Sequence, residues 1–593
     1  MSDTALRQRG MALHRAGRLA EAERLYAEVL RHDPGDWLVH LSRGGALLAL
    51  HHATQALAAF DAALALQPQC LEALHGRGMA LQRLQRIEEA LASFDAALVL
   101  QPQSAEVCNS RGNALRRLQR LAEALASYDR ALALQPALAV AHNNRGLVLQ
   151  ALGRYRDAAL SYERALALQP QFAEAYNNLG TLQCELGEPA AALASGARAL
   201  ELQPGMLGVH ANLGNALRDL GRAAEALAQY EQALLEAPDS AAAHCNRGNA
   251  LLDLQRLGEA SASYDRAIAL DPHYAQAYFN KSVCLLLAGD FAHGLPLYEW
   301  RRKLPHATAP PLAAPAWDGT QPLAGRTLLI YAEQALGDTL QFCRYAHLAE
   351  RRGAQVLLRV QPQLTGLLAS LGAAIRVTAA AEAPPDCDFQ CPLVSLPLAF
   401  GSGLPAVPAA VPYLAAEPRR VATWRARLGA DGFRVGIAWQ GSRNRIDIGR
   451  SVPLAMFAPL AAVPGVRLIS LQKGQGVEEL RRNPSAMPLE LPGEEFDAGS
   501  QAFLDSAALM QHLDLVITCD TALAHLAGAL ARPVWVALKY VPDWRWLLAR
   551  ADSPWYPSMR LFRQLRPGDW EGVFEAICHE LARLARGTAA ARP

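Results

Sequence analysis

The stretch LAEALASYDRALALQP, residues 121–136, returns as YRDAALSYERALALQP at residues 155–170, which is 34 residues further along the chain. Its closing proline occurs eight times at this spacing without a slip: Pro34, Pro68, Pro102, Pro136, Pro170, Pro204, Pro238 and Pro272. A fixed period of this length is typical of helical units that stack on one another and share a core. The first half of the chain is therefore predicted to be a repeat array.

Each repeat is predicted to hold two amphipathic helices, the second ended by the proline. In the fourth repeat, residues 105–118 and 121–134 carry apolar residues at three- and four-residue steps, and proline does not continue a helix. An aromatic residue lies eight positions before each proline, except in the sixth repeat, which has Gly196 there. A glycine 24 positions before the proline and an alanine 12 before it recur as well. We expect these small residues to let the helices approach closely and the aromatic residue to fill the gap between them.

Together these features resemble the tetratricopeptide repeat. The resemblance implies an α-solenoid over residues 1–303, with eight repeats and a ninth, capping helix pair that keeps Tyr298 but has Ser282 in place of the glycine. It also implies that the first helix of each pair lines the concave surface of the array.

A row of asparagines is the second regularity of the first half: Asn144, Asn178, Asn212, Asn246 and Asn280 are again 34 residues apart. On the concave surface they would form a ladder of amides, which can hydrogen-bond the backbone of an extended peptide. The array is then expected to bind a protein or peptide. In the alternative interpretation, these amides only satisfy neighbouring backbone groups.

Composition excludes several classes of protein. The net charge of the 593 residues is +1, which argues against a broad nucleic-acid surface. The hydrophobic fraction of 51% is raised by alanine, and no apolar run approaches the ~20 residues of a membrane span. Residues 1–10 do not resemble a signal peptide. The ten cysteines are scattered, which suits reduced thiols, so we expect a cytoplasmic protein.

From residue 304 the repeat period is lost. Residues 304–326 are rich in proline and alanine and are predicted to be a linker. Short apolar runs then alternate with helical segments, which favours parallel sheets in doubly wound domains. These runs are residues 327–332, 355–360, 374–377, 434–439, 466–471, 513–519 and 534–538. We predict one lobe over residues 327–415, a second over 416–593, and a ligand cleft between them.

The first candidate site residue is Asp338, in the turn after the predicted strand 327–332. Gly337 permits a tight passage of the backbone, and Asp338 falls in the first turn of the following helix. Aspartate at this place caps a helix. It also faces the predicted cleft, where a carboxylate can accept a proton, and both interpretations stay open.

The second candidate group is Asp520, Thr521, Ala522 and His525, where the predicted strand 513–519 runs into a helix. The opening amides and the dipole of a helix favour an anion such as a phosphate group. His525 lies one helical turn in, where it either reaches the same ligand or packs as a structural residue.

The third group follows two other predicted strands. Gly441, Ser442 and Arg443 come after the strand 434–439, and Lys473 ends the next. A glycine turn with basic and hydroxyl side chains can bind phosphate oxygens, although exposed arginines are common in loops. Five of the ten tryptophans lie between positions 535 and 570, where they either stack on a sugar or base or pack the last domain.

In their order along the chain, these groups resemble the ADP-heptose:lipopolysaccharide heptosyltransferase family, over residues 327–581. The resemblance implies a GT-B fold of two doubly wound Rossmann-like domains, the first on the acceptor side and the second on the nucleotide-sugar side. Gly337-Asp338 matches the family's glycine-aspartate, which implies that Asp338 is the general base. Residues 520–525 match the donor motif, with Ala522 where the family has glycine. Residues 441–443 resemble its phosphate-binding turn without the family's lysine.

Repeats joined to a GT-B half also resemble the overall plan of O-linked N-acetylglucosamine transferase, where an asparagine ladder binds protein acceptors. The chain is therefore expected to be a hexosyl- or heptosyl-type glycosyltransferase that uses a nucleotide diphosphate sugar, an acceptor hydroxyl, no cofactor and no metal. Residues 386–388 have the Asp-x-Asp form of a metal-binding triplet, but nothing else in the sequence supports a metal site there. The competing interpretation is a non-catalytic scaffold for protein–protein interaction with a degenerate transferase domain.

Overall fold

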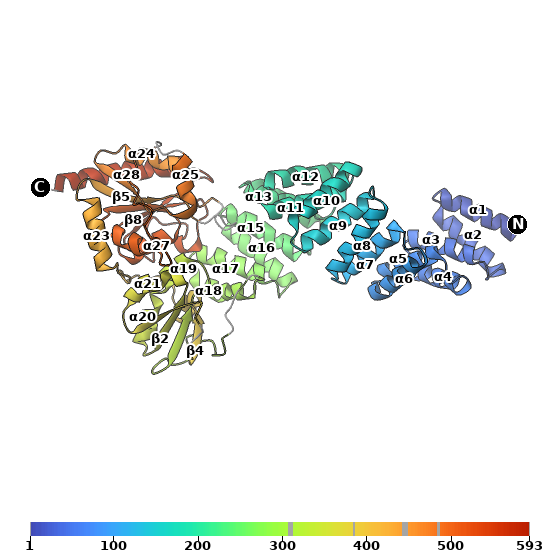
Figure 1. The fold of residues 1–593 in the computed structure, drawn as a ribbon, viewed down its shortest axis with the longest axis horizontal. Coiled ribbons are helices and arrows are strands. Elements are labelled where there is room, and N and C mark those ends of the chain that lie inside the picture. Colours follow the sequence, from blue (N-terminus) through green and yellow to red (C-terminus); the bar gives the residue numbers. More distant parts are fainter. Residues whose placement is uncertain are drawn as a thin grey trace. The chain divides into compact units, whose positions relative to one another are not determined.

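The computed structural model describes residues 2–305, 307, 312–382, 386–441, 449–482 and 487–591. Two predicted donor residues, Ser442 and Arg443, lie outside the described residues. The chain divides into two compact units, Met1–Leu220 and Gly221–Pro593 (Figure 1). The second unit holds the last repeats together with the α/β part of the chain.

The first unit consists of antiparallel helix pairs. Its helices are α1 (Asp3–Arg15), α2 (Leu19–His32), α3 (Trp37–Ala49), α4 (Ala53–Leu66), α5 (Leu71–Arg83), α6 (Ile87–Leu100), α7 (Ala105–Arg117), α8 (Leu121–Leu134), α9 (Ala139–Ala151), α10 (Tyr155–Leu168), α11 (Ala173–Leu186), α12 (Pro189–Leu202) and α13 (Val209–Asp219). The predicted helices 105–118 and 121–134 are α7 and α8, so the repeat prediction is confirmed.

The recurring glycine and aromatic residue are packed against each other. A Cβ atom added to Gly112 would lie 2.6 Å from the ring of Tyr128, which is fully buried. The sixth repeat has Gly196 where the others have the aromatic residue. Leu213 of the next repeat packs there instead, 2.7 Å from where a Cβ of Gly196 would stand. The aromatic residue therefore does fill the gap between helices, and the glycine makes room for it.

The second unit begins with the remaining helices of the array. They are α14 (Ala223–Glu236), α15 (Ala241–Asp253), α16 (Leu257–Leu270), α17 (Ala275–Leu287), α18 (Phe291–Tyr298) and the 3-10 helix η1 (Glu299–Lys303). The ninth pair, α17 and α18, shares one apolar core with the α/β part, in which Leu286, Phe291 and Tyr298 are buried. The ring of Phe291 lies 5.7 Å from that of Trp544. This pair joins the array to the α/β part.

The first α/β lobe has a four-stranded parallel sheet in the order β3-β2-β1-β4. Its elements are β1 (Thr327–Tyr331), α19 (Leu336–Phe342), α20 (Tyr345–Arg351), β2 (Gln355–Val360), η2 (Pro362–Leu364), α21 (Thr365–Leu368), η3 (Ala369–Leu371), β3 (Ile375–Ala379), β4 (Phe389–Pro392), η4 (Leu393–Ser395), α22 (Leu396–Ala399) and η5 (Leu404–Ala406). Strand order reverses beside β1, and ligands bind outside the carboxyl ends of strands at such a point.

The second lobe has a five-stranded parallel sheet in the order β6-β5-β7-β8-β9. Its elements are α23 (Pro418–Leu428), β5 (Phe433–Ala438), η7 (Leu454–Phe457), α24 (Ala458–Ala461), β6 (Val466–Ser470), η8 (Gly474–Gly476), α25 (Val477–Arg482), α26 (Leu504–Met510), β7 (Leu515–Cys519), α27 (Ala522–Ala529), β8 (Val534–Leu538), η9 (Trp544–Trp546), β9 (Met559–Arg563) and α28 (Trp570–Ala591). The predicted fold class, an α-solenoid followed by two doubly wound α/β domains, is confirmed.

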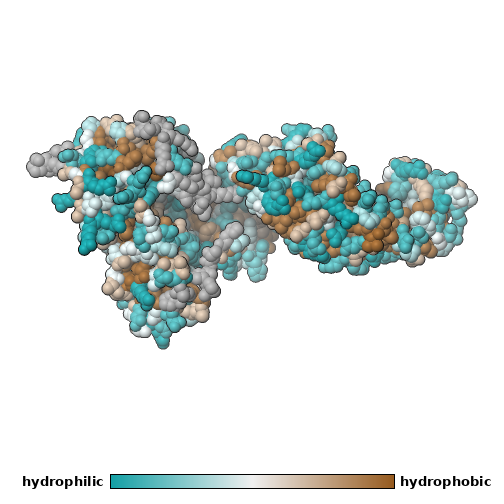
Figure 2. Space-filling model, in the orientation of Figure 1, coloured by the Kyte–Doolittle hydropathy of each residue, from teal (hydrophilic) through white to brown (hydrophobic). Residues whose placement is uncertain are grey.

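The described part of the predicted linker packs against the first sheet. The backbone N–H of Trp317 donates to the carbonyl of Gln390 in β4 over 2.8 Å, and the Trp317 side chain is buried. The face drawn in Figure 2 mixes hydrophilic and hydrophobic residues over the chain. Among the described residues, no helix is both long and apolar enough to span a bilayer.

Candidate active site

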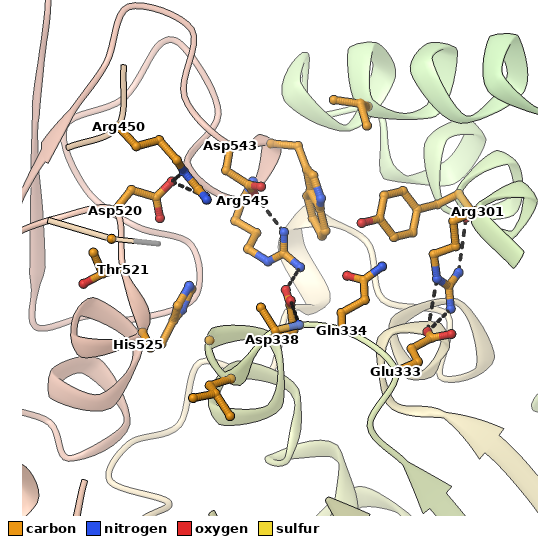
Figure 3. A pocket seen from close by; sticks show the side chains of 18 of the residues that line it. Arg301, Glu333, Gln334, Asp338, Arg450, Asp520, Thr521, His525, Asp543 and Arg545 are labelled. Carbon is orange, nitrogen blue, oxygen red and sulfur yellow. Dashed lines mark hydrogen bonds and ion pairs between the residues drawn. The ribbon is translucent and has the colours of Figure 1, made fainter. Parts of the chain in front are cut away.

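A cleft of about 1760 Å³ lies at the carboxyl ends of the strands in the second unit. It has three walls (Figure 3). The first lobe contributes the loop after β1, the second lobe contributes the segments after β5, β6, β7 and β8, and the array contributes residues of α17 and η1. The final repeat helices are thus part of the cleft.

Asp338 lies in the first turn of α19 and borders the cleft. Its Oδ2 accepts from the backbone N–H of Ala335 over 3.0 Å, and its Oδ1 accepts from Nη2 of Arg545 over 2.5 Å. Burial raises the pKa of Asp338, and the positive charge of Arg545 opposes that rise. Asp338 therefore caps the helix and also borders the cleft, and its role as a proton acceptor stays a prediction.

Arg545 is the residue in this cleft that sequence reasoning misses. It is buried in η9, where its Nη1 donates to Asp543 over 2.9 Å and its Nε donates to Gln341 over 2.6 Å. Figure 3 shows the guanidinium between the two carboxylates. All five tryptophans between positions 535 and 570 are buried, and Trp544 also lines the cleft. The pattern of this segment points to its tryptophans and gives no sign of a role for Arg545.

The second candidate group lies where β7 meets α27, with Thr521 as the residue before the helix. The first N–H groups of an α-helix have no acceptor within the helix, and Ala522 and Leu523, which carry them here, line the cleft. The carboxylate of Asp520 accepts from Nη2 of Arg450 over 2.8 Å. Arg450, which follows the glycine turn of the third group in the sequence, is thereby held at the helix end (Figure 3).

His525 is buried at the edge of the cleft. Its Nδ1 is 3.0 Å from the hydroxyl of Tyr556, and its ring is stacked on Trp546 with centroids 5.2 Å apart. A Cβ on Gly337 would lie 3.1 Å from His525 Cδ2, so the glycine lets α19 approach α27. Burial, with a smaller effect from Arg545, lowers the pKa of His525 to about 3. The imidazole is therefore neutral and packed.

The third group forms the rim of the cleft in the second lobe. Gly441 and Lys473 both line it, while Ser442 and Arg443 are not among the described residues. The side-chain oxygen of Gln472 accepts from the backbone N–H groups of Trp439 and Gln440, at 3.0 and 2.9 Å, which fixes the turn. Lys473 donates to the backbone carbonyl of Asp497.

The predicted asparagine ladder bonds within the array. Its side-chain amides donate to asparagines of the preceding repeat, as follows: Asn144 to Asn109 at 3.1 Å, Asn178 to Asn143 at 3.0 Å, Asn212 to Asn177 at 2.8 Å and Asn280 to Asn249 at 2.7 Å. Asn246 lies half-buried on α15. The acceptors are side-chain oxygens and not the backbone groups of the alternative interpretation, and peptide binding by the ladder stays a prediction. Asn109, Asn143 and Asn177 are a partner series that the sequence analysis did not use.

Arg301 ties the array to the first lobe. This buried side chain of η1 donates to Glu333, after β1, over 2.5 Å and to Glu299 over 2.6 Å. It also donates to the hydroxyl of Ser395 over 2.6 Å. The network holds the last helix of the array against the loop that carries the start of α19 (Figure 3).

The Asp-x-Asp triplet lies at the other end of the first sheet. The carboxylate of Asp388 accepts from the backbone N–H of Thr327 over 2.8 Å, where β1 begins, and pairs with Arg326 at 3.0 Å. It therefore stabilises the start of a strand and does not border the cleft. In the described part of the chain, no group of three or more His, Cys, Asp or Glu is placed to hold a metal ion.

Comparisons with known families agree with both halves of the chain. A tetratricopeptide repeat model matches residues 7–70, 41–105, 143–206, 212–275 and 245–299, and a TPR repeat model matches 112–153. A model of glycosyltransferase family 9 (heptosyltransferase) matches residues 467–538.

Individual relatives match parts of the chain. Protein FlbA of Caulobacter vibrioides is 28% identical over 327 residues, which are 51% of this chain and 54% of that protein. The chain thus spans about half the length of this curated relative. The solved structure of YrrB, a TPR protein with an unusual peptide-binding site, is 28% identical over 32% of this chain and 97% of its own, with a TM-score of 0.28. That of the type IV pilus biogenesis factor PilW is 27% identical over 35% and 96%, with a TM-score of 0.33. The chain therefore carries tetratricopeptide repeats followed by a domain of glycosyltransferase family 9 (heptosyltransferase).

Proposed function

We propose that the protein moves a sugar from a nucleoside diphosphate sugar to a hydroxyl group of an acceptor recruited by the repeat array. One observation carries the proposal. The carboxylate of Asp338 and the amino end of α27, with Arg450 held beside it, border the same cleft. A group that can accept a proton and a group that can bind a diphosphate are thus both within reach of one bound donor.

The diphosphate binds at the second lobe in this proposal. The opening amides of α27 at Ala522 and Leu523 and the guanidinium of Arg450 supply N–H donors and positive charge. Gly441 and Lys473, which line the cleft, complete the rim. Fixed donors of this kind stabilise the negative charge that develops on a leaving diphosphate, so the reaction is proposed to need no metal and no cofactor.

The acceptor enters from the first lobe and the array. As its oxygen attacks the anomeric carbon, the hydroxyl proton passes to Asp338, the carbon–oxygen bond to the diphosphate breaks, and the nucleoside diphosphate leaves. Attack from the side opposite the leaving group inverts the anomeric centre. The sugar is a hexose or a heptose.

We also propose a protein or peptide as the acceptor. A chain of amides runs along the last repeats toward the cleft: Asn280 donates to Asn249, and Gln276, which lines the cleft, donates to Asn280 over 2.7 Å. Backbone amides of an extended segment can exchange hydrogen bonds with such side chains. Because Arg301 anchors η1 to Glu333, a segment held by the last repeats would be presented beside Asp338.

A non-catalytic scaffold is the second candidate. It is favoured by the two carboxylates at the site, Asp338 and Asp520, which are both ion-paired to arginine, and by Ala522 in place of glycine. Under this alternative the cleft binds a nucleotide sugar, or nothing, and the array binds a partner protein.

A panel of nucleotides distinguishes the two candidates. Thermal unfolding of the full chain is measured with ADP, UDP, GDP and dTDP and with nucleotide sugars of each. For the nucleotide sugars that raise the Tm, the release of nucleoside diphosphate is then measured. The proposal expects a rise in Tm with one nucleotide class and slow release of its diphosphate. A rise without release over hours supports the scaffold, and no rise with any member contradicts donor binding. Arg450→Gln should abolish the shift, whereas Arg550→Gln, which alters an exposed pair with Asp552, should leave it unchanged.

A further inference from the structure

The guanidinium of Arg545 lies between two carboxylates. It binds Asp338 at 2.5 Å and Asp543 at 2.9 Å. The side chain itself is fixed, because Gln341 accepts from its Nε at 2.6 Å and its charge lies 4.6 Å from the centre of the Trp544 ring. The proposed transfer gives Arg545 and Asp543 no role of their own (Figure 3).

We propose that Arg545 is the positioning residue of the base: it holds the Asp338 carboxylate toward the cleft until the acceptor proton arrives, and Asp543 is its permanent counter-charge. The inference rests on the proposed function, in which Asp338 accepts that proton.

Geometry supports the aiming role. Each oxygen of Asp338 has a fixed donor, the backbone N–H of Ala335 at 3.0 Å on one side and Arg545 on the other. A guanidinium presents its N–H groups in a rigid plane, so a carboxylate bound to it has few orientations. The donors leave the second lone pair of each oxygen for an acceptor hydroxyl.

Asp543 supports the electrostatic part of the proposal. When Asp338 takes up the proton, its negative charge is lost, and a buried cation without a counter-charge is strongly destabilising. Asp543 keeps its ion pair with Arg545 throughout. The proton passes from the acceptor oxygen to Asp338, no bond to Arg545 is made or broken, and the arginine is never left unpaired.

Several elements place charged or titratable groups around Asp338. Arg545 and Asp543 come from the segment after β8, and Arg450 comes from the segment after β5, all in the second lobe. Tyr298 at the end of α18 and the neutral His525 on α27 complete the surroundings. Burial raises the pKa of Asp338, Arg545 and Arg450 lower it, and Asp543 raises it. Removing Arg545 should therefore raise the pKa of Asp338, and removing Asp543 should lower it.

The test is the pH dependence of kcat/KM, measured with the best donor of the nucleotide-sugar panel. Arg545→Gln should move the acidic limb of the profile to higher pH by at least one unit. It should also lower kcat/KM at neutral pH by at least tenfold, through a fall in kcat and not a rise in KM. Asp543→Asn should move the limb down, and Arg545→Lys should keep it near that of the wild type. Arg550→Gln serves as the control and should change nothing. A folded Gln variant with an unmoved limb would overturn the inference.

A second measurement needs no turnover. Thermal unfolding of the full chain is compared for Asp338→Asn, Arg545→Gln and the double variant at neutral pH. The inference expects the double variant to lose clearly less in Tm than the sum of the two single losses, and additive losses would contradict it. If the wild type uses no donor, or Asp338→Asn turns over at the wild-type rate, the proposed function fails and the inference fails with it. If Asp338→Asn loses turnover but Arg545→Gln leaves the acidic limb unmoved, the inference alone is overturned.

Discussion

Burial sets the charge of individual residues in the cleft. Asp338 and Asp520 both have raised pKa values because they are buried, and an arginine opposes the rise in each case. Among the described residues His525 forms no ion pair with a carboxylate; its ring lies against the Tyr556 hydroxyl and the Trp546 ring. It is therefore held neutral.

The first prediction concerns His525 and the free energy of unfolding. Its pKa of about 3 lies below the ordinary value of 6.5. The stability that comes from burying the neutral ring is complete above pH 6.5 and is lost as pH falls from there toward 3. At pH 5 the loss amounts to about 2 kcal/mol, since each pH unit in this window costs about 1.4 kcal/mol.

The measurement is urea unfolding of the wild type and His525→Gln at pH 7.5 and at pH 5. The wild type should lose about 2 kcal/mol more than the variant between the two values. Comparing the pH dependence removes any constant cost of the substitution. Equal losses of unfolding free energy in the wild type and the variant would contradict a buried, neutral histidine.

Single residues of the site differ in how well the sequence predicts them. Asp338, Asp520 and His525 lie in short motifs at strand ends, and these motifs place them at the cleft. Arg545 and Arg450 act through partners 207 and 70 residues away, and no local pattern records such a pairing. The pair of Arg545 with Asp338 joins the two lobes, and it depends on how the lobes pack, which the sequence does not display.

The helix pair is the element whose packing the sequence determines most directly. The glycine of each first helix and the aromatic residue of the second keep a fixed spacing because they touch. The second prediction is that Gly112→Ala, which would place a methyl group 2.6 Å from the Tyr128 ring, lowers the free energy of unfolding by about 1–3 kcal/mol through overpacking.

Gly258 provides the matched control for that substitution. It lies in α16 with open space where a Cβ would stand, so Gly258→Ala should be neutral or stabilising by about 0.5–1 kcal/mol. Chemical denaturation of both variants measures the difference. Equal effects at the two positions would contradict the packing account.

The third prediction concerns the contact between η1 and the first lobe. Arg301→Gln leaves Glu333 and Glu299 without their buried cation, and losing one partner of such a network costs about 3–5 kcal/mol. Arg302→Gln, which changes an exposed residue 3.8 Å from Glu299, should cost about 0–1 kcal/mol. Thermal unfolding of the two variants checks this, and a fall in Tm no larger for Arg301→Gln than for Arg302→Gln would contradict it.

Elements differ in predictability for physical reasons. Strands β1, β2, β3, β5, β6, β7 and β8 fall on the predicted apolar runs because both faces of each sheet are covered. Strand β9, MRLFR, lies outside the predicted runs because two of its five residues are arginines, which interrupt the apolar pattern. The asparagine row was found from its period, but its bonds to Asn109, Asn143 and Asn177 require knowing which residues face each other between repeats.

At the scale of the molecule, the array and the transferase domain are not separable at the predicted linker. The second compact unit begins at Gly221, and Leu286 and Phe291 belong to the core of the α/β lobes. A repeat array needs neighbours on both sides to bury its helix faces. Here the α/β lobes take the place of the next repeat.

The fourth prediction follows from this shared core. A fragment of residues 221–593 should fold, unfold cooperatively and keep the thermal shift with the nucleotide bound by the full chain. A fragment of residues 304–593 exposes the core surface that Leu286, Phe291 and Tyr298 cover, so it should aggregate or lack a cooperative transition. Circular dichroism and light scattering of the two fragments measure this, and a stable, monodisperse 304–593 fragment would contradict it.

The role of Asp338 is the central claim, and single-turnover transfer or hydrolysis at saturating donor tests it most directly. The wild type and Asp338→Asn are compared, with nucleotide binding measured on the same samples. The account predicts that the variant binds the donor with an affinity within a few-fold of the wild type and turns it over at least 1,000-fold more slowly, on the order of what a general base and its orientation contribute. An Asp338→Asn protein with wild-type turnover would contradict it.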